Sequence, residues 1–199
     1  MKLIEETTVP DGALPVDDLR AHLRLGTGFA EDTVQDEVLR SFLRASLAAI
    51  EGRTGKVLLE RTFRMDVIGW QCPDTQSLPV APVVAINSIE IVQRLGERSV
   101  VDGDVFWLEQ DNAHPKLRAV GYTLPNIPSA GRAEISFAAG YGPDWSDLPV
   151  DLRQAVMLLA AHYYEFRNDM GLSEGCMPFG VTSLIERYKT MRLFAGGAR

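Results

Sequence analysis

His162 and Glu165 are the residues of this chain whose types and spacing could most readily do chemistry. A separation of three positions places both side chains on one face of a helix, where an imidazole and a carboxylate can meet. Two ligands do not make a zinc site, and no zinc-protease motif surrounds them. We therefore interpret His162 as a structural or interface histidine. His22 and His114 have no partner nearby in the sequence, so a catalytic base would have to be assembled from distant segments.

Two further groups of polar residues do not form an active-site pattern either. Asp102-Gly103-Asp104 resembles a fragment of a calcium loop, yet the remaining ligand positions and the closing glutamate are missing. We interpret it as a hairpin turn. Ser136 and Ser183 lack the sequence context of a nucleophilic serine. The sequence therefore predicts no catalytic residue, no cofactor and no metal ion.

Gly140-Tyr141-Gly142 forms a glycine-rich turn shortly before a helix. A phosphate-binding loop would continue into Lys-Ser or Lys-Thr and lead directly into that helix. Here neither dipeptide follows, and Asp144 and Asp147 lie in between. Because carboxylates repel phosphate, we do not assign a phosphate site to this turn.

The composition is that of a soluble globular protein with an acidic balance. Of 199 residues, 46% are hydrophobic and 24% charged, enough for one domain, or one domain with a large insertion, around a real core. The net charge of −7 disfavours a protein that grips nucleic acid, because such binding is driven by phosphate neutralisation. An acidic protein could still line a passage through which DNA slides.

The cysteines and the N-terminus indicate the cellular compartment in which the protein is made and used. Cys72 and Cys176 form neither a metal-ligand spacing nor a disulfide framework, so we expect two reduced thiols. The N-terminus turns acidic at Glu5 and Glu6, and no apolar stretch approaches the roughly 20 residues of a membrane span. We expect a protein made and used in the cytoplasm, or in a particle assembled there.

The hydrophobic pattern divides the chain into a helical zone, a β-rich zone and a second helical zone. In the first, 15–25 predicts a short helix, and a longer helix begins near Asp32, where Asp32 and Gln35 match a capping box. Gly55 is a natural end for it. The residues expected on its inner face are Leu39, Phe42, Leu43, Ser46, Leu47 and Ile50.

From residue 56 to about 139 the period changes from that of a helix to that of a strand. Residues 62–68 alternate, with Phe63, Met65 and Val67 on one face. Further strands are expected at 84–92, 105–109, 117–120 and 133–137.

Helical spacing returns after Pro149, which suits a first helical position. The run 152–167 is the strongest helix in the chain. A last helix is expected at 184–193, ahead of a flexible tail at 194–199. The apolar face expected on the first of these helices comprises Leu152, Ala155, Val156, Leu159, Ala160, Tyr163 and Phe166.

Two aromatic features in this zone each have two interpretations. Tyr164 falls off the apolar face, and an exposed tyrosine there either anchors a subunit interface or is an ordinary surface residue. Tyr188, Leu193 and Phe194 form a surplus of apolar surface at the terminus. That surface is either completed by a partner or docked on its own domain.

The segments of this chain, taken in order, resemble the head–tail connector (adaptor) proteins of long-tailed phages and gene-transfer agents. The segments most similar to the family are Phe137-Ala138-Ala139-Gly140-Tyr141-Gly142 and the helix from Pro149 to Arg167. Gly52 and the loop at Gly175-Cys176 depart from the family and affect loop details. The other matching segments are 15–24, 31–32, 54–58, 62–64, 78–83, 89–92, 178–181 and 184–188.

The resemblance implies a ring protein of the particle neck. Members of this family bind beneath the portal protein after DNA packaging, usually as a dodecamer. They present a surface to the next neck protein, a stopper or tail-completion protein. DNA would pass through the channel without specific binding, and no membrane would be involved.

We therefore predict an α+β protein with a helical body at 1–56 and 141–199 and a β-rich insertion at 57–140, acting by binding and not by catalysis. A stopper or tail-completion protein is one alternative, and a small cytoplasmic enzyme is a more remote one. Tyr164 is the candidate subunit contact. The residues expected to contact the portal are Tyr188, Arg192, Leu193 and Phe194.

Overall fold

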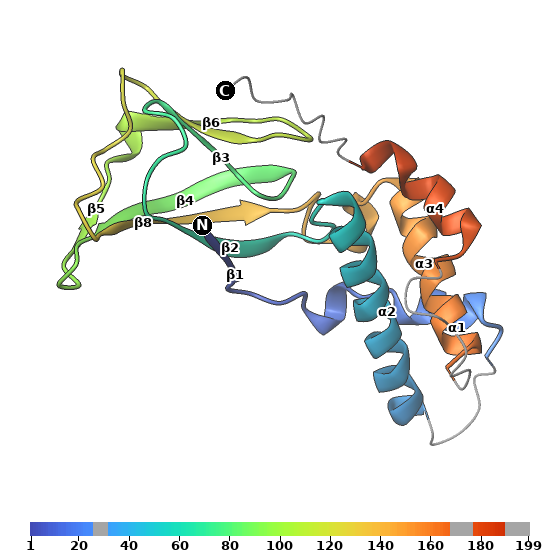
Figure 1. The fold of residues 1–199 in the computed structure, drawn as a ribbon. Coiled ribbons are helices and arrows are strands. Elements are labelled where there is room, and N and C mark those ends of the chain that lie inside the picture. Colours follow the sequence, from blue (N-terminus) through green and yellow to red (C-terminus); the bar gives the residue numbers. More distant parts are fainter. Residues whose placement is uncertain (26–31, 168–176, 190–199) are drawn as a thin grey trace. The chain divides into compact units, whose positions relative to one another are not determined.

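The computed structural model describes residues 1–25, 32–167 and 177–189, with side chains from Gln35 onward in the second helix. These residues form two compact units, each built from separate stretches of the chain (Figure 1). Residues 1–15 and 56–149 make a β unit, and residues 16–55 and 150 onward make a helical unit. Helices from both ends and strands from the middle confirm the α+β class.

The boundaries between the units differ from the predicted ones in two places. Residues 1–15 belong to the β unit, because strand β1 (Lys2–Glu5) pairs antiparallel with β2 (Arg61–Val67). Residues 141–149 also belong there. They are tied to it by Tyr141 N–H, which donates to Leu58 O at 3.1 Å, and by Gly142 O, which accepts from Glu60 N–H at 2.8 Å. Strand β1 has only four residues and, among the described strands, pairs with β2 alone, so its sequence shows no clear alternation of buried and exposed positions.

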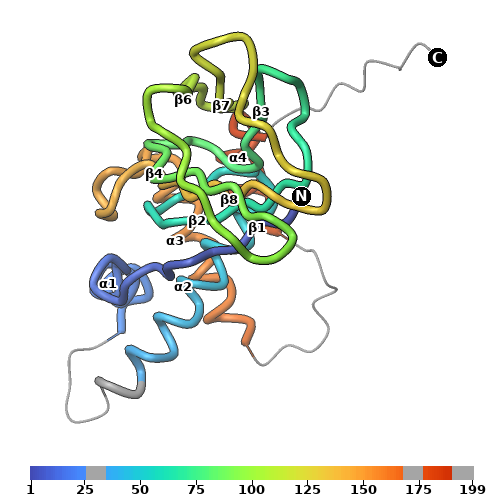
Figure 2. Tube along the Cα trace, turned by 90° about the vertical axis from the view of Figure 1, so that its left-hand side faces the viewer, coloured from blue at the N-terminus to red at the C-terminus, as the bar shows by residue number. Residues whose placement is uncertain are grey.

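Two antiparallel sheets build the β unit (Figures 1 and 2). The larger has the strand order β1-β2-β8-β4-β5, with β4 at Val83–Val92, β5 at Arg98–Val100 and β8 at Arg132–Ala139. The smaller has the order β3-β7-β6, from Thr75–Ser77, Lys116–Ala119 and Phe106–Glu109. Short 3-10 turns lie at Asp11–Ala13, Gly103–Val105 and Trp145–Asp147.

One face of the larger sheet forms the core of the β unit. The predicted inward set of β2, Phe63, Met65 and Val67, is buried as expected. The rings of Phe63 and Phe137 stack with centroids 5.9 Å apart. The second sheet contributes Leu117, so both sheets share one apolar cluster. Its other buried members include Leu78, Ile89, Ile91, Leu124, Ala133, Ile135 and Ala139.

The helical unit contains α1 (Val16–His22), α2 (Asp32–Thr54), α3 (Val150–Glu165) and α4 (Phe179–Ile185) among its described residues. Helix α3 packs against the other three (Figure 1). The inner face predicted for α2 is confirmed except that Phe42 is half-buried, whereas the side chain of Asp32 lies outside the described set.

Two predictions for the C-terminal helices are wrong. Phe166, placed on the apolar face of α3, is 42% exposed, because the helix ends at Glu165. The last helix begins at Phe179 and not at residue 184, directly after Pro178, whose fixed φ suits a helix entry. A 3-10 turn at Glu186–Tyr188 follows it, and residues 190–193 lie outside the described part.

The Gly-Tyr-Gly turn has a structural role at the end of β8. Gly140 adopts a φ of 141°, which disfavours any residue with a side chain. A Cβ atom there would stand 2.4 Å from Glu60 Cα. The Gly140 N–H donates to Pro82 O at 3.0 Å, so backbone from three segments of the chain meets at Gly140.

Replacing Gly140 with alanine therefore tests the close approach. We expect Gly140→Ala to destabilise the protein by about 1–3 kcal/mol, since it adds both strain and a backbone clash. Gly69→Ala is the matched control: nothing lies within 4 Å of its added Cβ. It should change the stability by less than about 0.5 kcal/mol. Urea unfolding measures both, and equal stabilities would contradict the role assigned to Gly140.

Candidate functional site

The residues that suggested chemistry in the sequence are not brought together. The ring centroids of His162 and Phe166 lie 4.7 Å apart, so the imidazole packs on an aromatic neighbour, while Glu165 is exposed. His22 and His114 are exposed. Within the described residues, no group of three or more His, Cys, Asp and Glu side chains is placed to hold a metal ion.

Asp102 to Asp104 form a turn, but not a hairpin. The Asp102 carboxylate accepts the Asp104 N–H at 3.2 Å and caps the 3-10 turn. That turn links β5 of one sheet to β6 of the other, which are not paired. Cys72 is an exposed free thiol, and Cys176 lies outside the described part. Ser136 lies on the outer face of β8, and Ser183 is exposed on α4.

The outer face of the larger sheet carries a network of charges across three strands. Glu134 on β8 is only 5% exposed and lies beside Glu90 on β4. Arg132 donates to Glu134 from Nε at 2.8 Å and from Nη2 at 2.5 Å. Arg98 bridges the carboxylates, with Nη1 3.0 Å from Glu134 and 2.9 Å from Glu90. Burial alone would raise the pKa of Glu134, but the two guanidinium groups lower it overall.

This network makes stability depend on pH. A carboxylate whose folded pKa is depressed contributes stability above its ordinary pKa of 4.5, and that stability is lost as the pH falls through the folded pKa. We expect Glu134→Gln to lower the free energy of unfolding by about 1–3 kcal/mol at pH 7. The gap, meaning the difference in unfolding free energy between the variant and the original protein, should become smaller below pH 4.5. Glu97→Gln, at an exposed position in the β4–β5 turn, is the control. Urea unfolding at pH 7 and pH 4 checks this, and a gap independent of pH would argue against it.

Tyr188 is the one predicted portal-contact residue that the described part includes. Its hydroxyl donates to Asp151 Oδ1 at 2.7 Å, linking the turn after α4 to the first turn of α3. The Arg187 guanidinium lies 4.8 Å over the Tyr188 ring and pairs with Asp151 Oδ2 at 2.7 Å. Burial, together with Asp151, raises the pKa of Tyr188. Its ring thus docks on its own helical unit. Arg192, Leu193 and Phe194 lie outside the described residues.

Removing the Tyr188 hydroxyl should weaken the helical unit. We expect Tyr188→Phe to lower the free energy of unfolding by about 1 kcal/mol, the usual value of one hydrogen bond. Because the folded pKa is raised, this contribution is complete below pH 10 and is lost as the pH rises through the folded pKa. Tyr122→Phe, at a residue that is 99% exposed, is the control. Thermal unfolding at pH 8 and pH 10.5 would reveal the effect, and equal losses in both variants would speak against it.

Tyr164 is half-buried, and not the freely exposed residue that its place on the helix suggested. Phe42 of α2 meets its ring edge-on, with centroids 6.2 Å apart and planes at 87°. The Arg167 guanidinium lies 4.4 Å over the ring. Tyr164 therefore helps to join α2 to α3.

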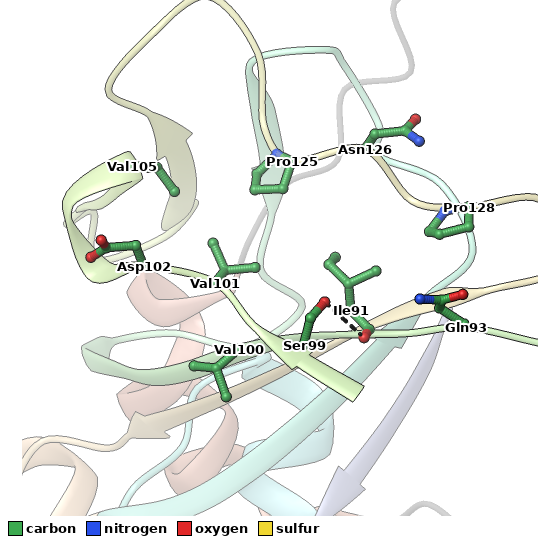
Figure 3. A pocket seen from close by; sticks show the side chains of 10 residues that line it. All are labelled: Ile91, Gln93, Ser99, Val100, Val101, Asp102, Val105, Pro125, Asn126 and Pro128. Atoms are coloured by element: carbon green, nitrogen blue, oxygen red, sulfur yellow. Dashed lines mark hydrogen bonds between the residues drawn. The ribbon is translucent and has the colours of Figure 1, made fainter. Parts of the chain in front are cut away.

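A groove of about 390 Å3 lies beside β5 in the β unit (Figure 3). Sequence reasoning missed it, because its walls come from β4, β5 and the loop around Pro125. The apolar side chains that line it include Ile91, Val101, Val105, Pro125 and Pro128. Within the described residues, no helix is both long enough and apolar enough to span a membrane.

Comparison with known proteins places the chain. It matches no protein-family profile and no curated protein. Among solved structures, it resembles a chain from the neck of an empty gene-transfer-agent particle with C6 symmetry, at 50% identity and a TM-score of 0.89. It also resembles a chain from the virion of a native gene-transfer-agent particle (50%, 0.86) and one from the neck of a native particle with C12 symmetry (46%, 0.85). Each alignment covers 98% of this chain and 99% of the other.

The fold and its relatives define a structural component of a particle neck, which supports a role other than catalysis. More particularly, the chain belongs to the family of gene-transfer-agent neck proteins, since it shares up to half of its residues with them over nearly its full length. The sequence alone had left phage and gene-transfer agent open.

Proposed function

We propose that this protein is the head–tail adaptor of a gene-transfer-agent particle: a ring beneath the portal that joins it to the next neck protein and leaves a channel for DNA. The observation that carries the proposal is the match over 98% of the chain to neck structures with C6 and C12 symmetry. The connector-like order of segments, from the opening helix to residues 178–181, supports the adaptor role specifically. The single head–tail connector domain is then the whole chain, with both of its units.

The overall charge agrees with this role. Twenty Lys and Arg residues oppose 27 Asp and Glu residues, which leaves the chain at −7. A ring of twelve such chains would carry a large negative charge, and DNA bearing phosphates would not adhere to it. DNA would therefore move through the channel without specific binding.

Electron microscopy of the purified portal, with and without this protein, tests the proposal. We expect an added ring of density at the narrow end of the portal. If both proteins are folded at micromolar concentration and no density is added, the adaptor role is wrong. A stopper or tail-completion role would then be indicated by cross-links to neck proteins other than the portal.

The portal contact is proposed to come from the C-terminal segment that includes Arg192, Leu193 and Phe194. Tyr188 fits this proposal as an anchor: its bond to Asp151 would fix the point from which that segment leaves the helical unit. A truncation that removes residues 185–199 would test the wrong property, because Ile185 is fully buried in that unit.

A chain that ends at residue 189 is the sharper test. We expect it to keep the helical unit, since α4 and the Tyr188 contact remain, and to lose at least about tenfold in portal affinity, equal to about 1.4 kcal/mol. Replacing Arg192, Leu193 and Phe194 together by alanine should have the same effect. Tyr122→Phe is a control with normal binding. Portal pull-down and calorimetry measure the affinities, and normal binding by the shortened chain would refute the assignment.

Tyr164 is proposed as a subunit contact in the same ring, through the part of its ring that Phe42 and Arg167 leave accessible. Because the residue also supports α2 and α3, Arg167→Ala is the milder probe of that surface. Loss of ring density on the portal without loss of thermal stability would support the contact.

A further inference from the structure

Among the described strands, β5 pairs with β4 alone, which leaves backbone groups unpaired at one edge of the larger sheet. Val101 N–H donates to Ile89 O and Gln93 N–H donates to Glu97 O, each at 2.8 Å. In an antiparallel ladder, residues alternate between facing the partner and facing away. The backbone of residues 97, 99 and 101 therefore faces β4, and that of Arg98 and Val100 faces away from the sheet. Their side chains point to the outer face, since Val100 lies opposite Glu90.

Strand β1 forms the other edge of the sheet. There, the residues whose backbone faces away from the sheet carry side chains on the inner face, the reverse of β5. Glu6 N–H donates to Thr62 O at 2.9 Å, so residues 2, 4 and 6 face β2 with their backbone. Leu3 and Glu5 face away from the sheet. Their side chains point to the inner face, because Leu3 lies opposite the buried Met65. Within the described residues, no further strand pairs with β1 or β5.

The two edges are complementary for parallel pairing of β5 with β1. Four antiparallel ladders separate β1 from β5, so the two strands run in the same direction. In a parallel ladder, one residue bonds to the two neighbours of the residue opposite it, and opposite side chains share a face. A register that places Val100 of one copy opposite Ile4 of the next meets both requirements. The two side chains point to the outer face, and the free backbone groups of Leu3 and Glu5, the neighbours of Ile4, face Val100. Antiparallel pairing would put inner and outer faces together.

We propose that β5 of one copy pairs in parallel with β1 of the next copy, so that the five-stranded sheet continues from subunit to subunit. This inference rests on the ring proposed above. A cyclic ring needs two different surfaces of one chain in contact, and the two edges of this sheet are such surfaces. Pairing of β1 with β1, or of β5 with β5, would instead give a twofold dimer, which builds neither C6 nor C12 symmetry.

The groove beside β5 is a second observation that favours this occupant. Its lining includes Ile91 and Ser99, which lie on the inner face of the sheet (Figure 3). When the sheet continues from one copy to the next, the inner faces of both copies lie on the same side. The β1 strand of the next copy would therefore present Leu3 on the side where the groove lies. Leu3 is 38% exposed in the single chain. Its burial in the groove would remove apolar surface from water and so stabilise the contact.

The shortness of the edges agrees with assembly on a template. Strand β5 has three residues and β1 has four, and short edge strands resist unwanted pairing of free chains. Such a contact is weak by itself. It becomes strong when the portal holds the neighbouring copies side by side.

Disulfide trapping tests the proposal directly. In a Cys72→Ser/Cys176→Ser background, Val100→Cys is combined in turn with Lys2→Cys, Ile4→Cys or Glu6→Cys. These are the outward-facing positions of β1 and of the residue directly after it, and they cover the expected register and a shift of two residues either way. Four strand spacings, roughly 19 Å, separate the two edges within one chain. That exceeds the roughly 7 Å limit for a disulfide, so each cross-link must join two copies. We expect one pair to give a ladder of oligomers after assembly on the portal and oxidation.

Two controls make the outcome decisive. Val100→Cys with Ile68→Cys moves the second cysteine to an exposed site away from the β1 edge and should give no ladder. Electron microscopy of the same samples reports whether rings formed. Rings without cross-links in any of the three pairs would overturn the sheet contact while leaving the adaptor role intact. Absence of rings from the cysteine-free parent would overturn both.

Val100→Pro gives an independent test without cysteines. It removes an N–H that faces away from β4, and proline is tolerated at such edge positions, so the free chain should stay folded. Ring occupancy on the portal should fall at least about tenfold, whereas Val100→Thr, which keeps the N–H, should assemble normally. Normal assembly of a folded Val100→Pro protein would refute the proposal.

Discussion

The pairing of β8 with both of its neighbours is the interaction on which the β unit depends. Its ladder with β2 runs from Arg61 opposite Ala139 to Val67 opposite Ala133, and its ladder with β4 covers almost the same residues. One face of this three-strand centre closes the apolar core around Phe137, and the other carries the Glu134 network. The same strand ends at Gly140, where the lack of a side chain lets three backbone segments meet. Sheet, core and exit to the C-terminal helices are thus fixed by eight residues of sequence.

The elements that the sequence predicted well are those with long, one-sided burial. Strand β2 alternates over its whole length, and α2 repeats its apolar positions through several turns, so one period dominates each segment. The strands that were missed, β1, β3 and β5, have three or four residues, and β1 and β5 are mostly exposed. Their positions are set by partners distant in the chain, such as Met65 for Leu3. No local pattern can show such a pairing, which is also why residues 1–15 were assigned to the wrong unit.

Interaction surfaces were harder to predict than elements. Tyr164 and Tyr188 were noticed as aromatic residues in the right region, but their neighbours Phe42 and Asp151 are far away in sequence and decide how much of each ring is free. The groove beside β5 gave no signal at all, because it arises where a loop passes over a sheet edge. The resemblance in segment order identified a neck protein correctly.

Both units are discontinuous in the chain, and this affects the order in which the protein can fold on the ribosome. The β unit needs residues 1–15 and 56–149, and it can close as soon as β8 and the turn after it have emerged. Helices α1 and α2 are synthesised early, but α3, against which they pack, follows only after residue 149. At the usual rates of synthesis, the apolar face of α2 therefore waits for several seconds, covered only by what the nascent chain or a chaperone provides. The β unit can thus complete its fold before the helical unit does.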